Sequence, residues 1–122
     1  MFPIDLETRA FRSGNGELGW TREEARVAIS ALEAQQQAIL GGELWWVPEG
    51  ETRWTGIIPQ RVGYPAAYHW ETEREADEEW LAYVHRCAVE SRQAVDALPG
   101  GDDLRADLAG RILYNLTWAS ED

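Results

Sequence analysis

A long amphipathic helix is the strongest structural signal in the sequence. Apolar or small residues recur at helical spacing, at Ala76, Trp80, Val84, Cys87, Ala88, Ser91, Val95 and Leu98. The stretch Thr72-Glu73-Arg74-Glu75 matches a capping box at the start of this helix, and Pro99-Gly100-Gly101 would end it near Leu98. A helix with one apolar stripe must bury that stripe against another element, which the rest of the chain has to supply.

A second helix and several strands are predicted to cover the apolar stripe of the long helix. Thr21-Arg22-Glu23-Glu24 is another capping box, and the apolar spacing after it predicts a helix from about Thr21 to Ile39, ended by Gly41-Gly42. Strand-forming residues predict a hairpin of residues 43–47 and 52–58 around a turn at 48–51. Further strands are predicted at 68–70 and, from alternating apolar residues, at 112–118 as a half-buried strand. Weaker signals predict an edge strand at 4–6, a turn at 13–16, a loop at 59–67, and a polar loop or short helix at 102–110.

The order of these elements predicts the fold class. A chain of 122 residues has room for one domain, spanning residues 1–122. Helix, hairpin, strand, long helix and strand follow one another in sequence. We therefore predict an α+β domain with two helices packed on one face of a small, mostly antiparallel sheet.

The charge balance restricts the partners. Asp and Glu number 22 against 11 basic residues, all of them arginine, which gives a formal net charge of −11. Such a field repels nucleic acid and anionic lipid and attracts basic proteins, so we expect neither a nucleic-acid nor a membrane partner. The sequence has no apolar run that could span a membrane and no secretion signal at its start. With one cysteine, Cys87, these features predict a cytoplasmic protein in a reducing compartment.

Signals for catalysis or cofactor binding are weak. Gly14-Asn15-Gly16-Glu17-Leu18-Gly19 spells GxGxxG, but no buried strand precedes it and several glutamates would face a bound phosphate. His85 has no metal-binding partner at helical spacing, and Cys87 lies in the apolar stripe, which predicts a buried, inert thiol. We therefore predict no catalytic residues, metal or cofactor, and a protein that is not an enzyme.

Acidic and aromatic residues gather before and at the start of the long predicted helix. Two interpretations are equally open: a solvated helix start favoured by the helix dipole, or a face for a basic protein. The second predicts a partner-binding set that comprises Trp54, Tyr68, Trp70, Glu71, Glu73, Glu75, Asp77 and Glu78. Of the other tryptophans, Trp20, Trp80 and Trp118 are predicted to be core residues, whereas one of Trp45 and Trp46 should point outward.

Three ordered stretches resemble a family of small bacterial immunity proteins from polymorphic toxin systems, the family catalogued as immunity protein 40. They are Leu18-Gly19-Trp20-Thr21 with Glu24-Ala25, then Leu40-Gly41-Gly42-Glu43-Leu44-Trp45, and finally Trp80-Leu81-Ala82-Tyr83-Val84. The chain departs from the family pattern before the second helix, where Ala66-Ala67-Tyr68-His69-Trp70 stands in place of an Asp-Asn-Trp and a cysteine.

The resemblance implies an inhibitor that binds and neutralises a cognate toxin protein. The composition points the same way, because an acidic surface can occupy a cationic active site quickly while aromatic anchors slow dissociation. On this hypothesis Trp54, Tyr68 and Trp70 anchor the contact and the five acids steer it. The alternatives are a small-ligand-binding module with an aromatic pocket and an acidic scaffold protein. The oligomeric state stays open.

Overall fold

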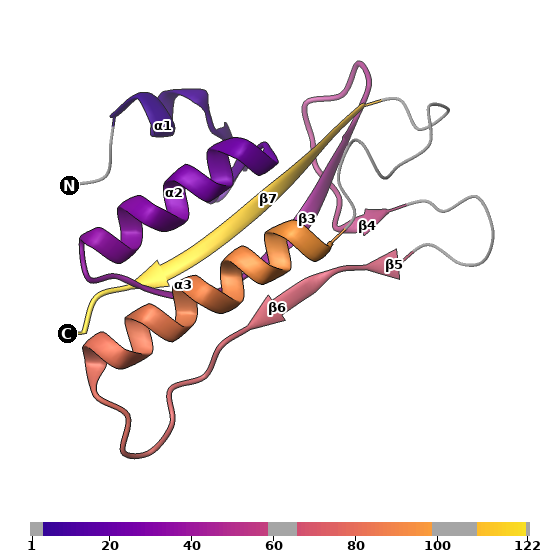
Figure 1. Cartoon of the computed structure of the whole chain (residues 1–122). Coiled ribbons are helices and arrows are strands. Elements are labelled where there is room, and N and C mark those ends of the chain that lie inside the picture. The colour runs from indigo at the N-terminus through magenta and orange to yellow at the C-terminus, as the bar shows by residue number, and fades with distance from the viewer. Residues whose placement is uncertain (1–3, 59–65, 99–109, 122) are drawn as a thin grey trace.

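The computed structural model describes residues 4–58, 66–98 and 110–121. The fold is α+β, as predicted, with α2 and α3 side by side on one face of a sheet (Figure 1). The elements follow in the order α1 (Ile4–Arg9), β1 (Phe11–Arg12), β2 (Leu18–Trp20), α2 (Arg22–Ala34), β3 (Ala38–Pro48), β4 (Ile57–Ile58), β5 (Ala66–Ala67), β6 (His69–Glu71), α3 (Trp80–Ala97) and β7 (Gly110–Ala119). No helix in the described ranges is long and apolar enough to cross a membrane.

The main sheet is antiparallel throughout and has the strand order β1-β2-β7-β3-β6. Strands β3 and β7 pair along their whole length, from Ala38 opposite Ala119 to Pro48 opposite Gly110, with one register shift between Ile39 and Gly41. β4 and β5 form a separate two-stranded ladder. β3 and β7 therefore form the centre of the fold, and each presents alternate side chains to the two faces of the sheet.

The face under α2 and α3 carries the larger hydrophobic core. Its buried members include Trp20, Ile29, Leu32, Ile39, Leu44, Val84, Cys87, Val95, Tyr114 and Leu116. The apolar stripe predicted for the long helix is confirmed, because Val84, Cys87 and Val95 are among the residues that α3 buries.

The other face, which none of the described helices covers, has a smaller apolar cluster at one end. Trp45, Val47 and Leu113 are buried there. Trp54 stacks on Trp45 with ring centroids 4.4 Å apart, and Phe11 meets the same indole edge-on at 6.0 Å. The strand predicted at 112–118 is thus confirmed as β7, but its centre is buried on both faces.

Helix α2 begins as predicted and ends earlier. The Glu24 amide donates to Thr21 Oγ1 at 3.3 Å, as the capping box requires. The helix ends at Ala34 because Gln36 adopts a left-handed φ of 60°, and the Gln37 amide closes the last turn on the Leu32 carbonyl at 2.9 Å. The prediction that Gly41-Gly42 would end this helix was wrong, since both glycines lie inside β3.

Helix α3 ends at Ala97, close to the predicted end, but begins eight residues later than predicted, at Trp80 instead of Thr72. Thr72 is buried, and its hydroxyl donates to Glu90 Oε1 at 2.9 Å, so it does not act as a helix cap. The Tyr83 hydroxyl donates to the Thr72 carbonyl at 2.6 Å and fixes the same backbone. These tertiary contacts are more favourable here than a local capping box.

The remaining predicted elements have mixed outcomes. Residues 4–6 belong to helix α1, not to an edge strand, and the Trp20 indole N–H holds α1 in place by donating to the Leu6 carbonyl at 2.8 Å. The turn at 13–16 is confirmed between β1 and β2, and the strand at 68–70 is confirmed as β6. The hairpin of 43–47 with 52–58 is wrong apart from a bridge between Trp46 and Thr55, because β3 pairs with β7 and β6 instead. Of the predicted loops, 66–67 form β5 and Gly110 begins β7, whereas 59–65 and 102–109 lie outside the described residues.

Candidate functional site

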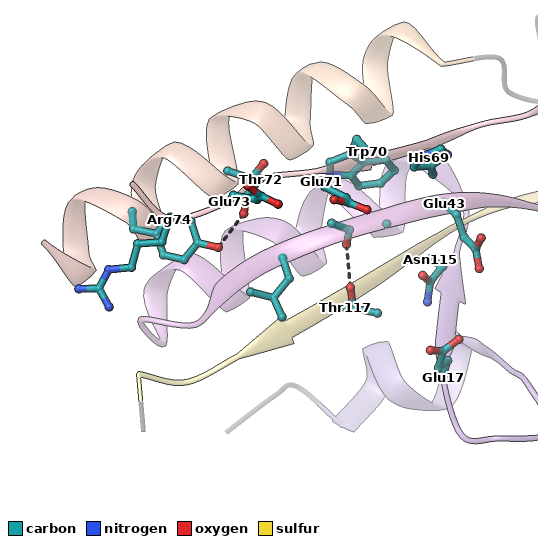
Figure 2. Close-up of a pocket in the computed structure, with 14 residues that line it drawn as sticks. Glu17, Glu43, His69, Trp70, Glu71, Thr72, Glu73, Arg74, Asn115 and Thr117 are labelled. Atoms are coloured by element: carbon teal, nitrogen blue, oxygen red, sulfur yellow. Dashed lines mark hydrogen bonds between the residues drawn. The ribbon is translucent and has the colours of Figure 1, made fainter. Parts of the chain in front are cut away.

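An open groove of about 590 Å³ lies beside β3 and β6, on the side of the sheet away from the described helices α2 and α3 (Figure 2). Four carboxylates line it, from Glu17, Glu43, Glu71 and Glu73. The acids come from three separate parts of the chain, which the sheet brings together. The groove continues the same face as the Trp45 cluster but is polar where that cluster is apolar.

Strand pairing fixes the geometry of the groove. Glu43 on β3 lies opposite His69 of β6 and Asn115 of β7. In the neighbouring row, Gly41 lies between Glu71 and Thr117, and the Thr117 hydroxyl donates to the Gly41 carbonyl at 3.2 Å. Residues directly opposite one another in an antiparallel pair place their side chains on the same face. The missing side chain at Gly41 leaves the middle of the second row open.

The close packing of the strands requires glycine at both positions 41 and 42. A Cβ at Gly42 would collide with the Asn115 carbonyl oxygen and lie 2.5 Å from the Trp70 indole ring. A Cβ at Gly41 would collide with the Trp70 carbonyl oxygen. The two glycines therefore allow β6 and β7 to approach β3 closely at the point where the groove forms.

Two polar side chains in the groove are held in fixed positions. The Trp45 indole N–H donates to Glu43 Oε1 at 2.9 Å, which orients this carboxylate. Asn115 is only 2% exposed, and its Nδ2 donates to the Leu18 carbonyl at 3.0 Å. Its Oδ1 accepts no hydrogen bond from any described residue, although the side chain lines the groove.

The negative charge of the groove is not neutralised by the arginine at its edge. Arg74 lines one end, but its Nε donates to the Glu78 carbonyl at 2.9 Å. Its guanidinium carbon lies 5.3 Å from the centre of the Trp80 ring, and its Nη2 lies 3.9 Å from Glu121. The groove is therefore built from hydrogen-bond acceptors that suit a positively charged group.

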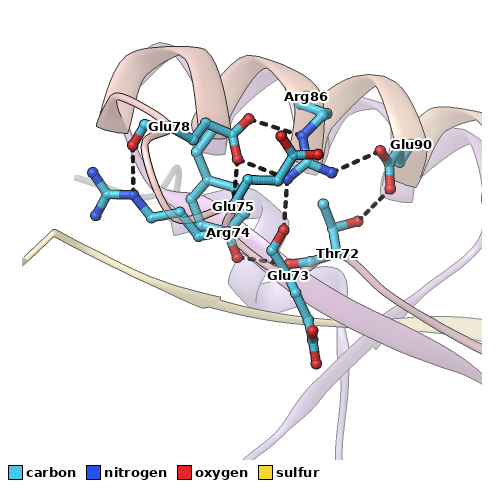
Figure 3. Close-up of polar contacts among 8 residues, drawn as sticks. Thr72, Glu73, Arg74, Glu75, Glu78, Arg86 and Glu90 are labelled. Carbon is cyan, nitrogen blue, oxygen red and sulfur yellow. Dashed lines mark hydrogen bonds and ion pairs between the residues drawn. The ribbon is translucent and has the colours of Figure 1, made fainter.

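Arg86 of α3 holds the acidic loop of residues 72–79 beside the groove (Figure 3). Its guanidinium donates to both carboxylate oxygens of Glu78 at 2.7 and 2.8 Å, to Glu90 at 3.0 Å, and to the Glu73 carbonyl at 2.5 Å. Hydrogen bonding to Arg86 lowers the pKa of Glu78 to about 2, and the Glu75 amide contributes by donating to Glu78 Oε1 at 3.0 Å. The loop is thus fixed on the helix surface by charge-assisted hydrogen bonds.

The predicted acidic partner-binding residues separate into two groups. Four of them, Glu71, Glu73, Glu75 and Asp77, are exposed, and the first two line the groove. Glu78 is paired with Arg86, and its side chain is only 12% exposed. The expectation that these acids open the long helix was wrong, because they lie in β6 and in the loop before α3, whose first turn contains no acid.

The three predicted aromatic anchors do not share one surface. Tyr68 and Trp70 are half-buried and pack against the core under the helices, and the Trp70 indole N–H donates to Ser91 Oγ at 3.2 Å. Trp70 is also one of the residues that line the groove. Trp54 is half-buried as well but packs on Trp45 on the opposite side of the sheet.

The other tryptophans mostly follow the prediction. Trp20 is fully buried in the main core, and Trp80 and Trp118 are half-buried against it. Trp45 and Trp46 point to opposite faces, but Trp45 is covered completely, so neither projects freely into solvent. The indole nitrogen of Trp46 is buried without a hydrogen-bond partner among the described residues.

Three features that could have indicated catalysis or cofactor binding take part instead in packing or in hydrogen bonds within the fold. Cys87 is fully buried, and its burial raises the pKa of the thiol. His85 Nδ1 lies 2.8 Å from Glu33 on α2, and the hydrogen bonds from His85 and Arg92 lower the pKa of Glu33. The GxGxxG stretch lies in β2 and the turn before it, where the Glu17 amide donates to Ser13 Oγ at 3.1 Å. Within the described ranges, no group of three or more His, Cys, Asp or Glu side chains is placed to hold a metal.

Sequence reasoning missed Glu17, Glu43, His69, Asn115 and Thr117 as groove residues. The alternation in β7 carried a signal, because Asn115 and Thr117 occupy the face opposite Tyr114, Leu116 and Trp118. No family model, curated protein or solved structure matches this chain.

Proposed function

We propose that this protein is an immunity protein that binds and neutralises a basic bacterial toxin through the acidic face around the groove. The observation that carries the proposal is the groove itself. It gathers four carboxylates, and its lining arginine is engaged outside it. A basic protein surface complements this arrangement in both charge and hydrogen bonding.

Electrostatic attraction explains why such a face suits an inhibitor. A net charge of −11 raises the rate of encounter with a cationic partner, and a nuclease or similar toxin has a cationic site because it must hold phosphate. The resemblance to immunity protein 40 supports the same class of function. The exposed acids Glu71, Glu73, Glu75 and Asp77 extend the negative surface from the groove along the loop.

The loop is also suited to binding because it is already ordered. Arg86 and Thr72 tie its backbone and side chains to α3 before any partner arrives. A preorganised surface loses less conformational entropy on association than one that must order itself. Trp54 beside the Trp45 cluster supplies apolar area at one end of this face.

Co-expression with the toxin tests the proposal. A toxin domain encoded beside this protein should arrest growth when expressed alone, and the arrest should be lifted when this protein is co-expressed. The groove variant Glu17→Gln/Glu71→Gln/Glu73→Gln should protect poorly at limiting expression, because it removes three of the lining charges. Continued growth arrest with the wild-type protein present in excess would contradict the proposal.

A matched control separates the groove from net charge. Glu7→Gln/Glu49→Gln/Glu51→Gln removes the same number of charges at exposed positions outside the groove. It should protect as the wild-type protein does. Equal loss of protection in both triple variants would assign the effect to overall charge.

The alternative small-ligand module is favoured by one observation, a groove whose size is within the range of small-molecule sites. It predicts saturable thermal stabilisation by a sugar or heterocycle that stacks on Trp70. Stabilisation by such a ligand, together with no protection from any neighbouring toxin, would favour this alternative.

A further inference from the structure

One row of residues crosses all five strands on the helix-free face of the sheet. His69, Glu43, Asn115, Gly19 and Phe11 are successive cross-strand partners, from β6 through β3, β7 and β2 to β1. At the Phe11 end the row is closed, because the Trp45 ring lies over Gly19 and against Phe11. At the Glu43 end it opens into the groove.

Asn115 marks the bottom of the open end. Asn115 is only 2% exposed, and its amide nitrogen donates a hydrogen bond to the Leu18 carbonyl at 3.0 Å. Its amide oxygen receives no hydrogen bond from the described residues, yet it belongs to a side chain that lines the groove. Only Trp46 Nε1 is a buried side-chain atom without a partner among the described residues, so the Asn115 oxygen is accessible from the groove and can accept from a ligand that brings N–H groups.

Two carboxylates line the groove near Asn115, whose side chain is drawn between those of Glu43 and Glu17 in Figure 2. The Trp45 indole occupies one oxygen of Glu43 and leaves Oε2 without a partner among the described residues. Glu17 is anchored through its backbone, which exchanges hydrogen bonds with Ser13 at 2.8 and 3.1 Å. The three side chains therefore bring carboxylate and amide oxygens, which are hydrogen-bond acceptors, to one part of the groove.

We propose that the space between Glu43, Asn115 and Glu17 is a socket for an arginine side chain of the toxin. The inference rests on the proposed function and names the group that the groove receives. A guanidinium has N–H donors on several edges and no acceptor, so one group can reach the Asn115 oxygen and a carboxylate together. A guanidinium is weakly hydrated, and the aliphatic stem of the arginine can lie on Leu40, which lines the groove and is 42% exposed.

A titration that does not need the toxin tests the socket. Nα-acetyl-arginine amide is added to ¹⁵N-labelled protein at constant ionic strength, with Nα-acetyl-lysine amide as the matched probe. The ¹⁵N–¹H signal of the Trp45 indole reports on Glu43, to which it donates. The signal of the Asn115 side-chain amide reports on the neighbouring position in β7. We expect saturable shifts of both signals with the arginine probe and about tenfold weaker binding of the lysine probe, since lysine cannot bridge both acceptors as a planar fork.

Two variants make the result specific. Glu43→Gln keeps an acceptor for the Trp45 indole but removes the charge, and it should weaken arginine binding about tenfold. Glu7→Gln removes one exposed charge on α1 and should bind as the wild type does. Shifts that never saturate, equal binding of lysine, or unchanged binding by Glu43→Gln would each overturn the socket. Protection against the toxin is measured separately, so a failed socket with intact protection leaves the inhibitor proposal standing.

Discussion

The two faces of the sheet are built from the same two strands and have opposite surroundings. On one face Leu44 and Tyr114 are buried under α2 and α3. On the other, their sequence neighbours Trp45 and Asn115 belong to a surface that the helices of the described ranges leave uncovered. The comparison shows how a short chain can combine a buried core on one face and an open polar groove on the other in one pair of strands.

Within the helix-free face, aromatic packing gives way to an acidic groove. Trp54 and Phe11 cover Trp45 at one end, whereas Gly41 leaves the other end without a side chain. A contiguous apolar surface would invite nonspecific association, but this face becomes polar where it becomes open. The covered half supports the sheet, and the open half is available to a partner.

Replacing adjacent residues in β3 compares the two faces most directly. Leu44→Ala should lower the free energy of unfolding by about 2–5 kcal/mol and Trp45→Ala by about 3–5 kcal/mol, because each leaves a cavity in a buried cluster. Urea unfolding followed by far-UV circular dichroism measures both. If Trp45→Ala lowers the free energy of unfolding by less than about 1 kcal/mol, the cluster of Trp45, Val47 and Leu113 is not part of the stabilising core.

The close approach of the strands at the groove can be tested at Gly42. Gly42→Ala should destabilise the protein by about 1–3 kcal/mol, because the new Cβ meets the Asn115 carbonyl and the Trp70 ring. Gly14→Ala is the matched control, since nothing lies within 4 Å of its added Cβ. Equal stability of the two variants in thermal and urea unfolding would contradict the close approach of β6 and β7 to β3 at Gly42.

The apolar end of the open face is expected to contribute to toxin binding. Trp54→Ala should weaken the complex by about 2 kcal/mol, mainly through faster dissociation, as for other aromatic anchors. Surface plasmon resonance with the immobilised toxin separates the two rate constants. Trp118→Phe, at a half-buried position against the main core, serves as an aromatic control. An unchanged dissociation rate for Trp54→Ala would remove Trp54 from the contact.

Acid should loosen the loop of residues 72–79 before it unfolds the sheet. The pKa of Glu78 is lowered from the ordinary value of 4.5 to about 2, so its ion pair stabilises the folded state above pH 4.5 and is lost as the pH falls towards 2. The ¹⁵N–¹H signal of the Glu75 amide, which donates to Glu78, measures this step. Glu78→Gln should abolish this acid transition. A transition midpoint near pH 4.5 in the wild-type protein would contradict the hydrogen-bonded ion pair between Glu78 and Arg86.

The smallest effect on stability is expected from the rim acids. Glu71→Gln/Glu73→Gln should change the free energy of unfolding by no more than about 0.5 kcal/mol, because both side chains are exposed. The same variant should slow association with the toxin and reduce its salt dependence. Stopped-flow association at several salt concentrations, with Glu49→Gln/Glu51→Gln as the charge-matched control, distinguishes local steering from net charge.

Local patterns predicted the fold class and several elements. The capping box at Thr21 located the start of α2, and the alternation of residues 112–118 identified β7. The same type of box at Thr72 failed because Thr72 is buried against Glu90 and Tyr83, contacts that are distant in sequence. Gly41-Gly42 was misread for a related reason, since these glycines serve close strand packing and not a helix end.

The groove was less accessible to sequence reasoning than the fold. Glu71 and Glu73 were predicted from the local density of acids, and they line it. Glu17, Glu43 and Asn115 meet only through the register of β3 with β7 and of β7 with β2. A long-range register is not encoded in any short window of sequence, so the acids that define the groove could not be separated from the other carboxylates.

The pairing of β3 with β7 also has a consequence for the order of events during translation. β7 leaves the ribosome after every other described element, whereas the helices and the β1–β2 turn can form from local contacts. Until β7 arrives, β3 lacks its longest partner, and Trp45 and Trp46 have no closed core to enter. The nascent chain therefore displays an aromatic strand edge, so binding by chaperones during synthesis is expected to matter more for this protein than its small size suggests.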